Sequence, residues 1–377
     1  MNYIAKIIAF IAVILSITSC KGLSNVELDR VKLADDKASI PTKVLYERIA
    51  AIGKQGIAFG QQDATIYGIN WKQQDNPTAL RSDIKDVSGK LPAIHGYDLG
   101  HIELNKTFNL DTVSFALIRG QVKKLHKNGA IFTFSWHLDN PVSNGSSWDT
   151  ISAVKEILKG GKEREKYEKW VSRISIFFNS LEDEKGQKIP VVFRPFHEMN
   201  GGWFWWGEGN CSAEDYKELW RQTFVLLQQN NVHNLLFSYA PNIMQSVEDF
   251  EKYYPGDEYV DILGVDIYNY GGKEAFIRNI KTNLEILKGK SQSTSKPYAL
   301  TETGNINPGV DSQWWTQTLY KGIKDSGISW VLLWRNARLD HYFSTYKDDI
   351  TAEDFRNFEQ LEETLFLDEV KKINFKY

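Results

Sequence analysis

The segment PVVFRPFHEMNGG, residues 190–202, contains the pattern from which we predict the fold. It starts with an apolar run without polar alternation, which is typical of a parallel strand that is buried on both faces. The run leads into a polar loop that contains His197 and Glu198. An amphipathic segment over 213–230 follows, with apolar side chains three and four positions apart. A strand, a polar loop and a helix in this order form one unit of an α/β fold.

The same unit recurs along the chain. The strand-like runs are 56–60, 91–97, 130–136, 190–196, 235–240, 262–268, 298–301 and 329–334. We expect helices between them, among others at 111–127, 213–230 and 273–288. Alternating strands and helices predict a parallel sheet, and eight such units predict closure into a single (β/α)8 TIM barrel. A doubly wound open sheet is the alternative, but the first run, GIAFG, lacks the glycine spacing of a nucleotide-binding turn.

Composition excludes several classes of protein. The chain has 377 residues, of which 42% are hydrophobic and 25% charged, so it is neither fibrous nor wholly disordered. A net charge of −3 gives no reason to expect a nucleic acid partner. The 12 Trp, 17 Tyr and 20 Phe exceed the needs of an ordinary core. Aromatic rings stack on the flat faces of pyranoses, so this content indicates a sugar-binding cleft.

The N-terminus has the features of an export signal. Residues 1–19 combine Lys6 with an apolar run that is too short to span a bilayer, which is typical of a signal peptide. The run ends in ITSC, residues 17–20, which resembles a bacterial lipobox. We therefore expect lipidation of Cys20, a tether over 20–38 and a catalytic domain over 39–377. An ordinary signal peptide with a chance cysteine is the alternative.

The predicted lipidation of Cys20 determines which cysteine pairing and which cellular location we expect. With Cys20 acylated, Cys211 has no intramolecular partner, and no disulfide is expected. Membrane contact is expected through the N-terminal lipid only. No acidic pair follows Cys20 in the segment KGLSN, residues 21–25, which favours a periplasm-facing anchor in the outer membrane over the cell surface.

Polar and aromatic residues follow the strand-like runs, where a barrel carries its active site. Two carboxylates stand out: Glu198 ends the fourth run and Glu302 ends the seventh. Strands four and seven face each other across an eight-stranded barrel, so the two side chains can converge. Carboxyl groups about 5–5.5 Å apart suit glycosidic cleavage with retention of configuration. A lone glutamate at a strand end is more often a salt-bridged residue, but the pair favours catalysis.

At these carboxylates the sequence resembles a known family. The stretch FRPFHEMNGGWFWWG, residues 193–207, resembles the acid/base motif of glycoside hydrolase family 26, and TETG, residues 301–304, is similar to its nucleophile strand. The likeness extends over about 56–340. It implies β-mannan or manno-oligosaccharides as substrate, because most members are endo-β-1,4-mannanases. Smaller groups of the family act on β-1,3-xylan or on mixed-linkage β-glucan.

The resemblance also implies a role for each residue around the two carboxylates. Glu198 would be the general acid/base and Glu302 the nucleophile. Arg194 is expected to hold Glu302 ionised, and Tyr268 to hydrogen-bond it. A wall formed by Trp203 and Trp206 would desolvate Glu198 and raise its pKa. Substrate contacts are expected from His137, His197, Trp148, Trp203, Trp206, Trp334 and Arg335.

Some of these residues have a structural alternative. The run WFWW, residues 203–206, cannot face the substrate with every ring, so half of it is expected in the loop core. Trp148 lies on a loop where a buried anchor and a sugar platform are both possible. His95 fits a core histidine, and Trp314 and Trp315 fit the core of the seventh helix.

Two other functions compete with the glycosidase. A metal-dependent hydrolase would use His95, His137 and His197 as ligands, but no His-x-His pair ends a strand. A non-catalytic glycan-binding lipoprotein would not need both carboxylates. We expect no metal, no cofactor and no obligate protein partner. The loops over 61–71 and 139–148 are long enough to close one end of the cleft, so the choice between internal cleavage and mannobiose release stays open.

Overall fold

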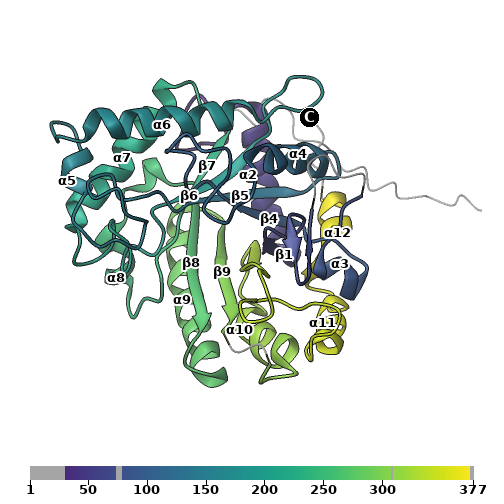
Figure 1. The fold of residues 1–377 in the computed structure, drawn as a ribbon. Helices are drawn as coiled ribbons and strands as arrows, with labels where there is room; N and C mark the ends of the chain where they lie inside the picture. The colour runs from purple at the N-terminus through teal and green to yellow at the C-terminus, as the bar shows by residue number, and fades with distance from the viewer. Residues whose placement is uncertain (1–29, 74–78, 307–308, 374–377) are drawn as a thin grey trace, which may run out of the picture.

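Eight parallel strands close into a barrel in the computed structural model, which describes residues 30–73, 79–306 and 309–373 (Figure 1). In chain order the barrel strands are β1 (Ile57–Gln62), β4 (Ile94–Asp98), β5 (Ile131–Trp136), β6 (Val191–Pro195), β7 (Leu235–Tyr239), β8 (Ile262–Asn269), β9 (Tyr298–Asn305) and β10 (Trp330–Leu333). Each pairs with the next, and β10 pairs with β1, which closes the sheet. The predicted (β/α)8 barrel is confirmed.

Helices surround the barrel and alternate with its strands. They are α2 (Ile40–Ile52), α3 (Asp83–Ser88), α4 (Phe115–His126), α5 (Val154–Ile157), α6 (Arg164–Asn179), α7 (Ala213–Gln229), α8 (Val247–Tyr253), η1 (Asp257–Tyr259), α9 (Lys273–Thr294), η2 (Trp315–Leu319), α10 (Tyr320–Ile323), α11 (Ala352–Glu359) and α12 (Leu367–Lys372). Short strands β2 (Tyr67–Gly68) and β3 (Trp71–Lys72) form a hairpin, and β11 (Thr364–Leu365) adds to β1. Among the helices of the described ranges, none is both long and apolar enough to cross a lipid bilayer.

The predicted start of one helix agrees with the structure, and the predicted start of another does not. α7 begins where expected, because the Ser212 side chain accepts a hydrogen bond from the Asp215 backbone N–H. α4 begins at Phe115 and not at 111, since Ser114 is its N-cap. Thr112 has a φ of 63°, a left-handed conformation that a helix cannot include. The loop before α4 is therefore longer than the apolar pattern predicted.

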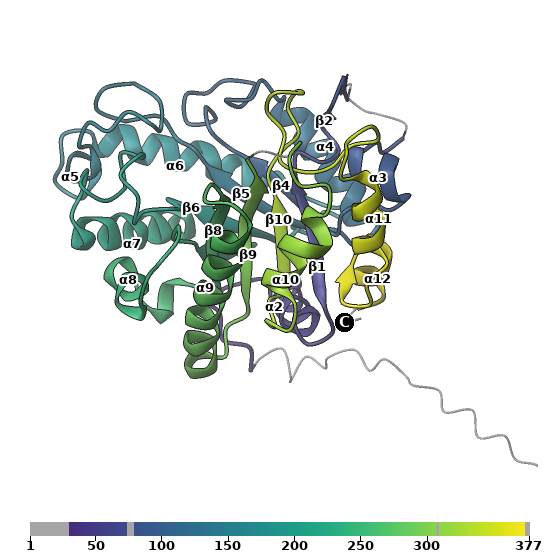
Figure 2. The same ribbon diagram turned by 90° about the horizontal axis from the view of Figure 1, so that it is seen from below.

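The N-terminal ends of the strands are covered by two helices. Apolar side chains of α2 and α12 pack against the first residues of the barrel strands, and Figure 2 shows both helices at this end of the barrel. The chain before α2 is also held there: the Ala34 N–H donates to Asp261 at 2.7 Å, and His233 pairs with Asp35 at 2.8 Å. The packed domain therefore extends N-terminally beyond the expected boundary at 39. The expected signal peptide and Cys20 lie outside the described residues.

Candidate active site

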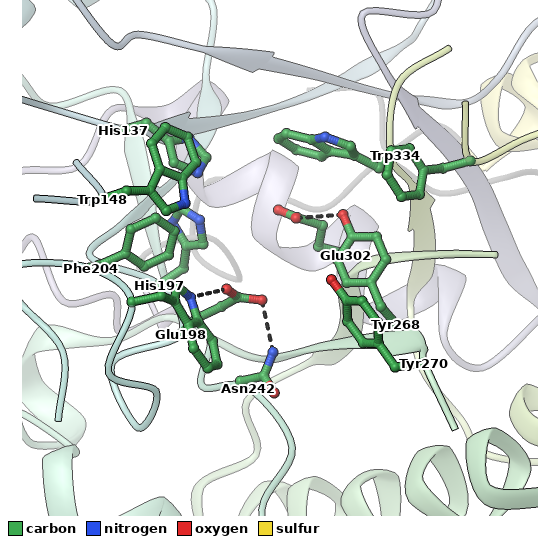
Figure 3. Close-up of a pocket in the computed structure, with 12 residues that line it drawn as sticks. His137, Trp148, His197, Glu198, Phe204, Asn242, Tyr268, Tyr270, Glu302 and Trp334 are labelled. Atoms are coloured by element: carbon green, nitrogen blue, oxygen red, sulfur yellow. Dashed lines mark hydrogen bonds between the residues drawn. The ribbon is translucent and has the colours of Figure 1, made fainter. Parts of the chain in front are cut away.

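A cavity of about 510 Å³ opens at the C-terminal ends of the strands. It is lined by His137, Trp148, His197, Glu198, Trp203, Phe204, Asn242, Tyr268, Tyr270, Glu302, Trp334 and Phe343. Glu198 and Glu302 face each other from opposite sides of it, as Figure 3 shows. The two carboxylates that stood out in the sequence therefore share one cavity at the barrel face where a site was expected.

Glu198 follows β6 in a strained loop. Its φ is 56° and that of Phe196 is 47°, conformations that non-glycine residues rarely adopt and that occur preferentially at functional sites. The Glu198 N–H donates to the Ala240 carbonyl at 2.8 Å, which ties the loop to the segment after β7. The side chain accepts hydrogen bonds from Asn242 Nδ2 at 2.9 Å and from Trp203 Nε1 at 2.8 Å.

The environment of Glu198 favours its protonated form. Burial and the negative charge of Glu302 raise the pKa of Glu198 to about 7, although the hydrogen bonds from Asn242 and Trp203 act in the opposite direction. Arg194 also opposes the rise. A carboxylic acid that keeps its proton near neutral pH can serve as a general acid.

Glu302 is placed by an irregularity in the sheet. The register between β8 and β9 shifts after Val265, so that Asp266 lies opposite Glu302 and Thr301 is the extra residue. Such a bulge redirects the side chains that follow it. The Thr301 hydroxyl donates to Val265 O at 3.1 Å and to Asp266 Oδ1 at 2.7 Å, which holds the bulge in place.

Both oxygens of Glu302 accept hydrogen bonds from strong donors. The Tyr268 hydroxyl donates to Oε1 at 2.7 Å, and the Arg194 guanidinium donates to Oε2. Arg194 is buried and also pairs with Asp266. Burial disfavours the charged guanidinium, but Asp266 and Glu302 outweigh this effect and raise the pKa of Arg194 above its usual range. This donor set gives Glu302 a cationic partner and fixes the orientation of its two oxygens. The expected contacts of Arg194 and Tyr268 with Glu302 are present.

The two predicted histidines lie side by side in the cavity wall. The rings of His137 and His197 meet edge to face with centroids 4.6 Å apart. The Trp334 ring lies 6.1 Å from that of His137, and it lines the same cavity. Trp148 is half exposed and stacks on His137 with centroids 5.3 Å apart. These four side chains are therefore available to a ligand at the end of the cavity that Trp334 borders.

The aromatic run after Glu198 is divided between cavity and core, as expected. Trp203 and Phe204 line the cavity, whereas Trp205 and Trp206 are fully buried. The assignment of Trp206 to substrate binding is therefore wrong. Its indole N–H donates to the His197 carbonyl at 2.9 Å and its ring stacks beneath Phe204 at 4.5 Å, so it supports the wall from behind. Phe204 occupies the position in the wall that the sequence assigned to Trp206.

Arg335 lies after β10 and binds residues of two other loops. It does not line the cavity, and it forms an ion pair with Asp111 at 2.8 Å and a hydrogen bond to the Tyr67 hydroxyl at 3.2 Å. These two partners hold the guanidinium outside the wall of this cavity, and the contact of Arg335 with substrate stays a prediction. The pairing joins the loops after β1, β4 and β10.

Four lining residues, Asn242, Phe204, Tyr270 and Phe343, are not among the predicted site residues. Asn242 follows the fifth strand-like run, a position that could have suggested its contact with Glu198. Phe204 belongs to the recognised motif, but nothing in the motif separates it from Trp206. Tyr270 and Phe343 come from loops without a sequence signal.

The histidines do not form a metal centre in the described part of the chain. His95 is fully buried and its Nε2 lies 3.0 Å from the Pro92 carbonyl oxygen, so it is a core residue. No group of three His, Cys, Asp or Glu side chains in residues 30–73, 79–306 and 309–373 is arranged to hold a metal ion. Trp314 and Trp315 are buried core residues, as expected.

Comparison with known proteins agrees with this architecture. A β-mannanase of family 26 from Bacteroides ovatus is 40% identical, and the match covers 88% of this chain and 97% of that chain with a TM-score of 0.84. The catalytic domain of a Bacillus endo-β-1,4-mannanase is 31% identical, with 91% and 96% covered and a TM-score of 0.84.

Curated relatives match over part of their own length. The mannan endo-1,4-β-mannosidase of Bifidobacterium adolescentis is 31% identical over 297 residues, which are 76% of this chain and 29% of that protein. The protein of the same name from Bacillus subtilis is 32% identical over 235 residues, which are 59% of this chain and 60% of that protein. This chain thus spans less than two thirds of either relative. Residues 34–319 match the model of glycosyl hydrolase family 26. The chain belongs to glycosyl hydrolase family 26.

Proposed function

We propose that this protein hydrolyses β-1,4-mannosidic linkages in mannan, glucomannan or galactomannan with retention of configuration, with Glu198 as general acid/base and Glu302 as nucleophile. One observation carries the assignment. The two carboxylates face each other across one cavity, but their hydrogen-bond partners differ in charge. Glu302 receives a hydrogen bond from the cationic Arg194, whereas the described donors to Glu198 are the neutral side chains of Asn242 and Trp203.

The roles follow from this difference. In the first step an oxygen of Glu302 attacks the anomeric carbon while the glycosidic bond breaks, and Glu198 transfers its proton to the leaving oxygen. In the second step Glu198 accepts a proton from water, the water oxygen attacks the same carbon, and the bond to Glu302 breaks. Two inversions give net retention. Tyr268 donates to Glu302 Oε1, which leaves the carboxylate one defined orientation toward the sugar.

The substrate assignment rests on the relatives. The two solved and the two curated proteins described above are named as mannanases or mannan endo-1,4-β-mannosidases. Activity on β-1,3-xylan or mixed-linkage β-glucan is the alternative within the family, and a non-catalytic glycan-binding protein is the alternative outside it. We leave the choice between internal cleavage and mannobiose release open, and a product time course on linear mannohexaose separates the two modes.

A panel of polysaccharides tests the function. Reducing-sugar release is expected from β-mannan and neither from β-1,3-xylan nor from mixed-linkage glucan, and proton NMR of the first product should detect the β-anomer. Glu198→Gln and Glu302→Gln should each abolish turnover without loss of the folded state in circular dichroism. Mannan hydrolysis by either variant at the wild-type rate would refute its role, and inactivity of the wild-type protein on all three glycans would refute the enzyme.

We also propose that Cys20 is lipid-modified and anchors the protein to the periplasmic face of the outer membrane. The lipobox-like segment before Cys20 supports this proposal. Cys20→Ser should release the protein from the membrane fraction, and protease added to intact cells should leave the wild-type protein uncut. Digestion on intact cells would instead indicate the cell surface.

A further inference from the structure

Asp98 ends β4 directly behind the cavity wall and does not line the cavity. Its side chain is 1% exposed. Oδ2 lies 2.7 Å from His137 Nδ1 and accepts a hydrogen bond from the Ser135 hydroxyl at 2.6 Å. Oδ1 accepts from the Gly100 N–H at 2.7 Å and from the His137 N–H at 3.4 Å. Both oxygens are therefore held by β5 and by the turn after β4, so the carboxylate cannot reorient freely.

This contact determines which nitrogen of His137 carries a proton. Burial acts to raise the pKa of Asp98, but His137 and the hydrogen bonds from Ser135 and Gly100 outweigh burial and lower this pKa to about 2. Asp98 is therefore a carboxylate and can only accept, so His137 Nδ1 must donate. Among the residues that the structure describes, Nε2 of His137 has no hydrogen-bond partner, and the ring lines the cavity.

The neighbouring imidazole has no such carboxylate. Burial, and after it the charges of Arg194 and His137, lower the pKa of His197 well below its usual value, so this ring is neutral. Burial, and to a smaller extent the charge of Arg194, act to lower the pKa of His137. Asp98 and Glu302 more than offset these two effects, so the pKa of His137 is raised. The charged or titratable groups around His137 are Asp98 from β4, Asp111 from the loop after β4, Arg194 from β6, His197 from the loop after β6 and Glu302 from β9. The two adjacent imidazoles therefore differ in their affinity for a proton, which is higher at His137 than at His197.

We propose that Asp98 is a positioning residue for substrate binding, because its carboxylate fixes the His137 ring so that Nε2 faces the sugar in the part of the cavity that Trp334 borders. The proposal rests on the proposed glycosidase function. At pH values below the raised pKa of His137, Nε2 carries a proton and donates to a sugar hydroxyl. Asp98 does not need to contact the substrate. Its effect on substrate binding is transmitted through the hydrogen bond to His137 Nδ1.

Nitrogen-15 NMR of histidine in the wild-type protein tests the contact without any variant. Nδ1 of His137 should stay protonated throughout a pH titration, and Nε2 alone should take up a proton, with a midpoint above that of free histidine. Asp98→Asn should move this midpoint to lower pH. A neutral ring with its proton on Nε2 in the wild-type protein would overturn the proposal, and so would an unchanged midpoint in the variant.

A double-mutant cycle tests the consequence for binding. Because a hydrogen bond to a charged group is lost, Asp98→Asn should lower kcat/KM about 10- to 100-fold. In the His137→Ala background the same change should have almost no further effect, since Asp98 would act only through His137. Two losses that multiply would overturn the proposal. If the wild-type protein cleaves another glycan of the panel, the cycle is measured on that glycan. If it cleaves none, the proposed function fails while the NMR titration still tests the contact.

Asp261 offers a matched control at the other end of the barrel. It is equally buried and accepts hydrogen bonds from the backbone N–H groups of Ala34 at 2.7 Å and Phe237 at 2.8 Å. Asp261→Asn should lower the unfolding temperature and leave kcat/KM unchanged. A loss of kcat/KM as large as that of Asp98→Asn would show that the effect is general destabilisation, which overturns the role of Asp98.

Discussion

Replacing Trp203 with phenylalanine separates its two contributions to the site. The indole Nε1–H donates to Glu198 at 2.8 Å, and the ring forms part of the cavity wall. Trp203→Phe keeps an aromatic ring and removes the donor. The lost hydrogen bond stabilised the ionised form of Glu198, so its loss should raise the pKa of Glu198 further above about 7. The catalytic acid would then stay protonated to higher pH.

The magnitude follows from the strength of the bond. A hydrogen bond to a charged group contributes about 1.5–3 kcal/mol, and about 1.4 kcal/mol corresponds to one pKa unit, so complete loss would raise the pKa by about one to two units. Trp203 is 40% exposed, and water can replace part of its donor capacity. We therefore expect a rise of about half a unit to one unit.

The pH dependence of kcat/KM on a linear manno-oligosaccharide measures this shift, because its basic limb reports the pKa of the acid in the free enzyme. Activity falls as pH rises through that pKa, so the basic limb of the variant should lie at higher pH than that of the wild-type protein. Trp148→Phe is the control, since Trp148 lines the cavity and makes no contact with Glu198. A basic limb that stays in place or moves to lower pH would refute the assignment of Glu198 as the acid.

Three further variants test the charged network. Tyr268→Phe removes the 2.7 Å hydrogen bond to Glu302 and should lower kcat about 10²-fold with little change in unfolding temperature; an unchanged kcat would contradict the positioning of the nucleophile. Arg194→Met leaves Glu302 and Asp266 buried without their cation, and denaturant unfolding should detect a loss of about 3–5 kcal/mol, whereas a loss below about 1 kcal/mol would contradict the ion pairs. Asp266→Asn removes a carboxyl group that pairs with Arg194, which leaves more of the Arg194 charge to act on Glu198. The basic limb of the pH profile should therefore move to lower pH, opposite to the shift of Trp203→Phe, and a shift in the same direction would contradict this account.

Much of the barrel was predictable because several of its strands are runs of consecutive apolar residues. A strand buried on both faces needs consecutive apolar residues, and this requirement makes runs such as that of β6 visible without any partner. α7 was predictable because Ser212 marks its start by a local hydrogen bond. Glu198 and Glu302 were predictable as a pair because strand order alone determines which sides of a barrel they come from.

Other features depend on contacts between distant parts of the chain. Trp206 and Phe204 are two residues apart in one aromatic run, and only the path of the folded loop decides that Phe204 faces the cavity. Arg335 is kept out of the cavity wall by Asp111, which belongs to the loop after β4. Local sequence contains no signal for either outcome, because the deciding partner lies elsewhere in the fold. The helices α2 and α12 were not predicted for a related reason: they cover the N-terminal ends of the strands, a surface that exists only once the barrel has closed.

The different roles of the two glutamates are best understood from the charge of the whole cluster. Arg194 pairs with both Asp266 and Glu302, so its one positive charge is shared between two buried carboxyl groups. Ionising Glu198 would add a negative charge at a buried site where its donors are the neutral Asn242 and Trp203 side chains, so burial and repulsion by Glu302 both favour its proton. Asp266 contributes to this effect because it binds the guanidinium that would otherwise act more strongly on Glu198. A second buried aspartate, Asp98, acts in a similar way on the histidines, since it favours the protonated form of one of two adjacent imidazoles. In both pairs identical side chains differ in their electrostatic surroundings, because a buried aspartate behind the cavity wall interacts unequally with the two sites.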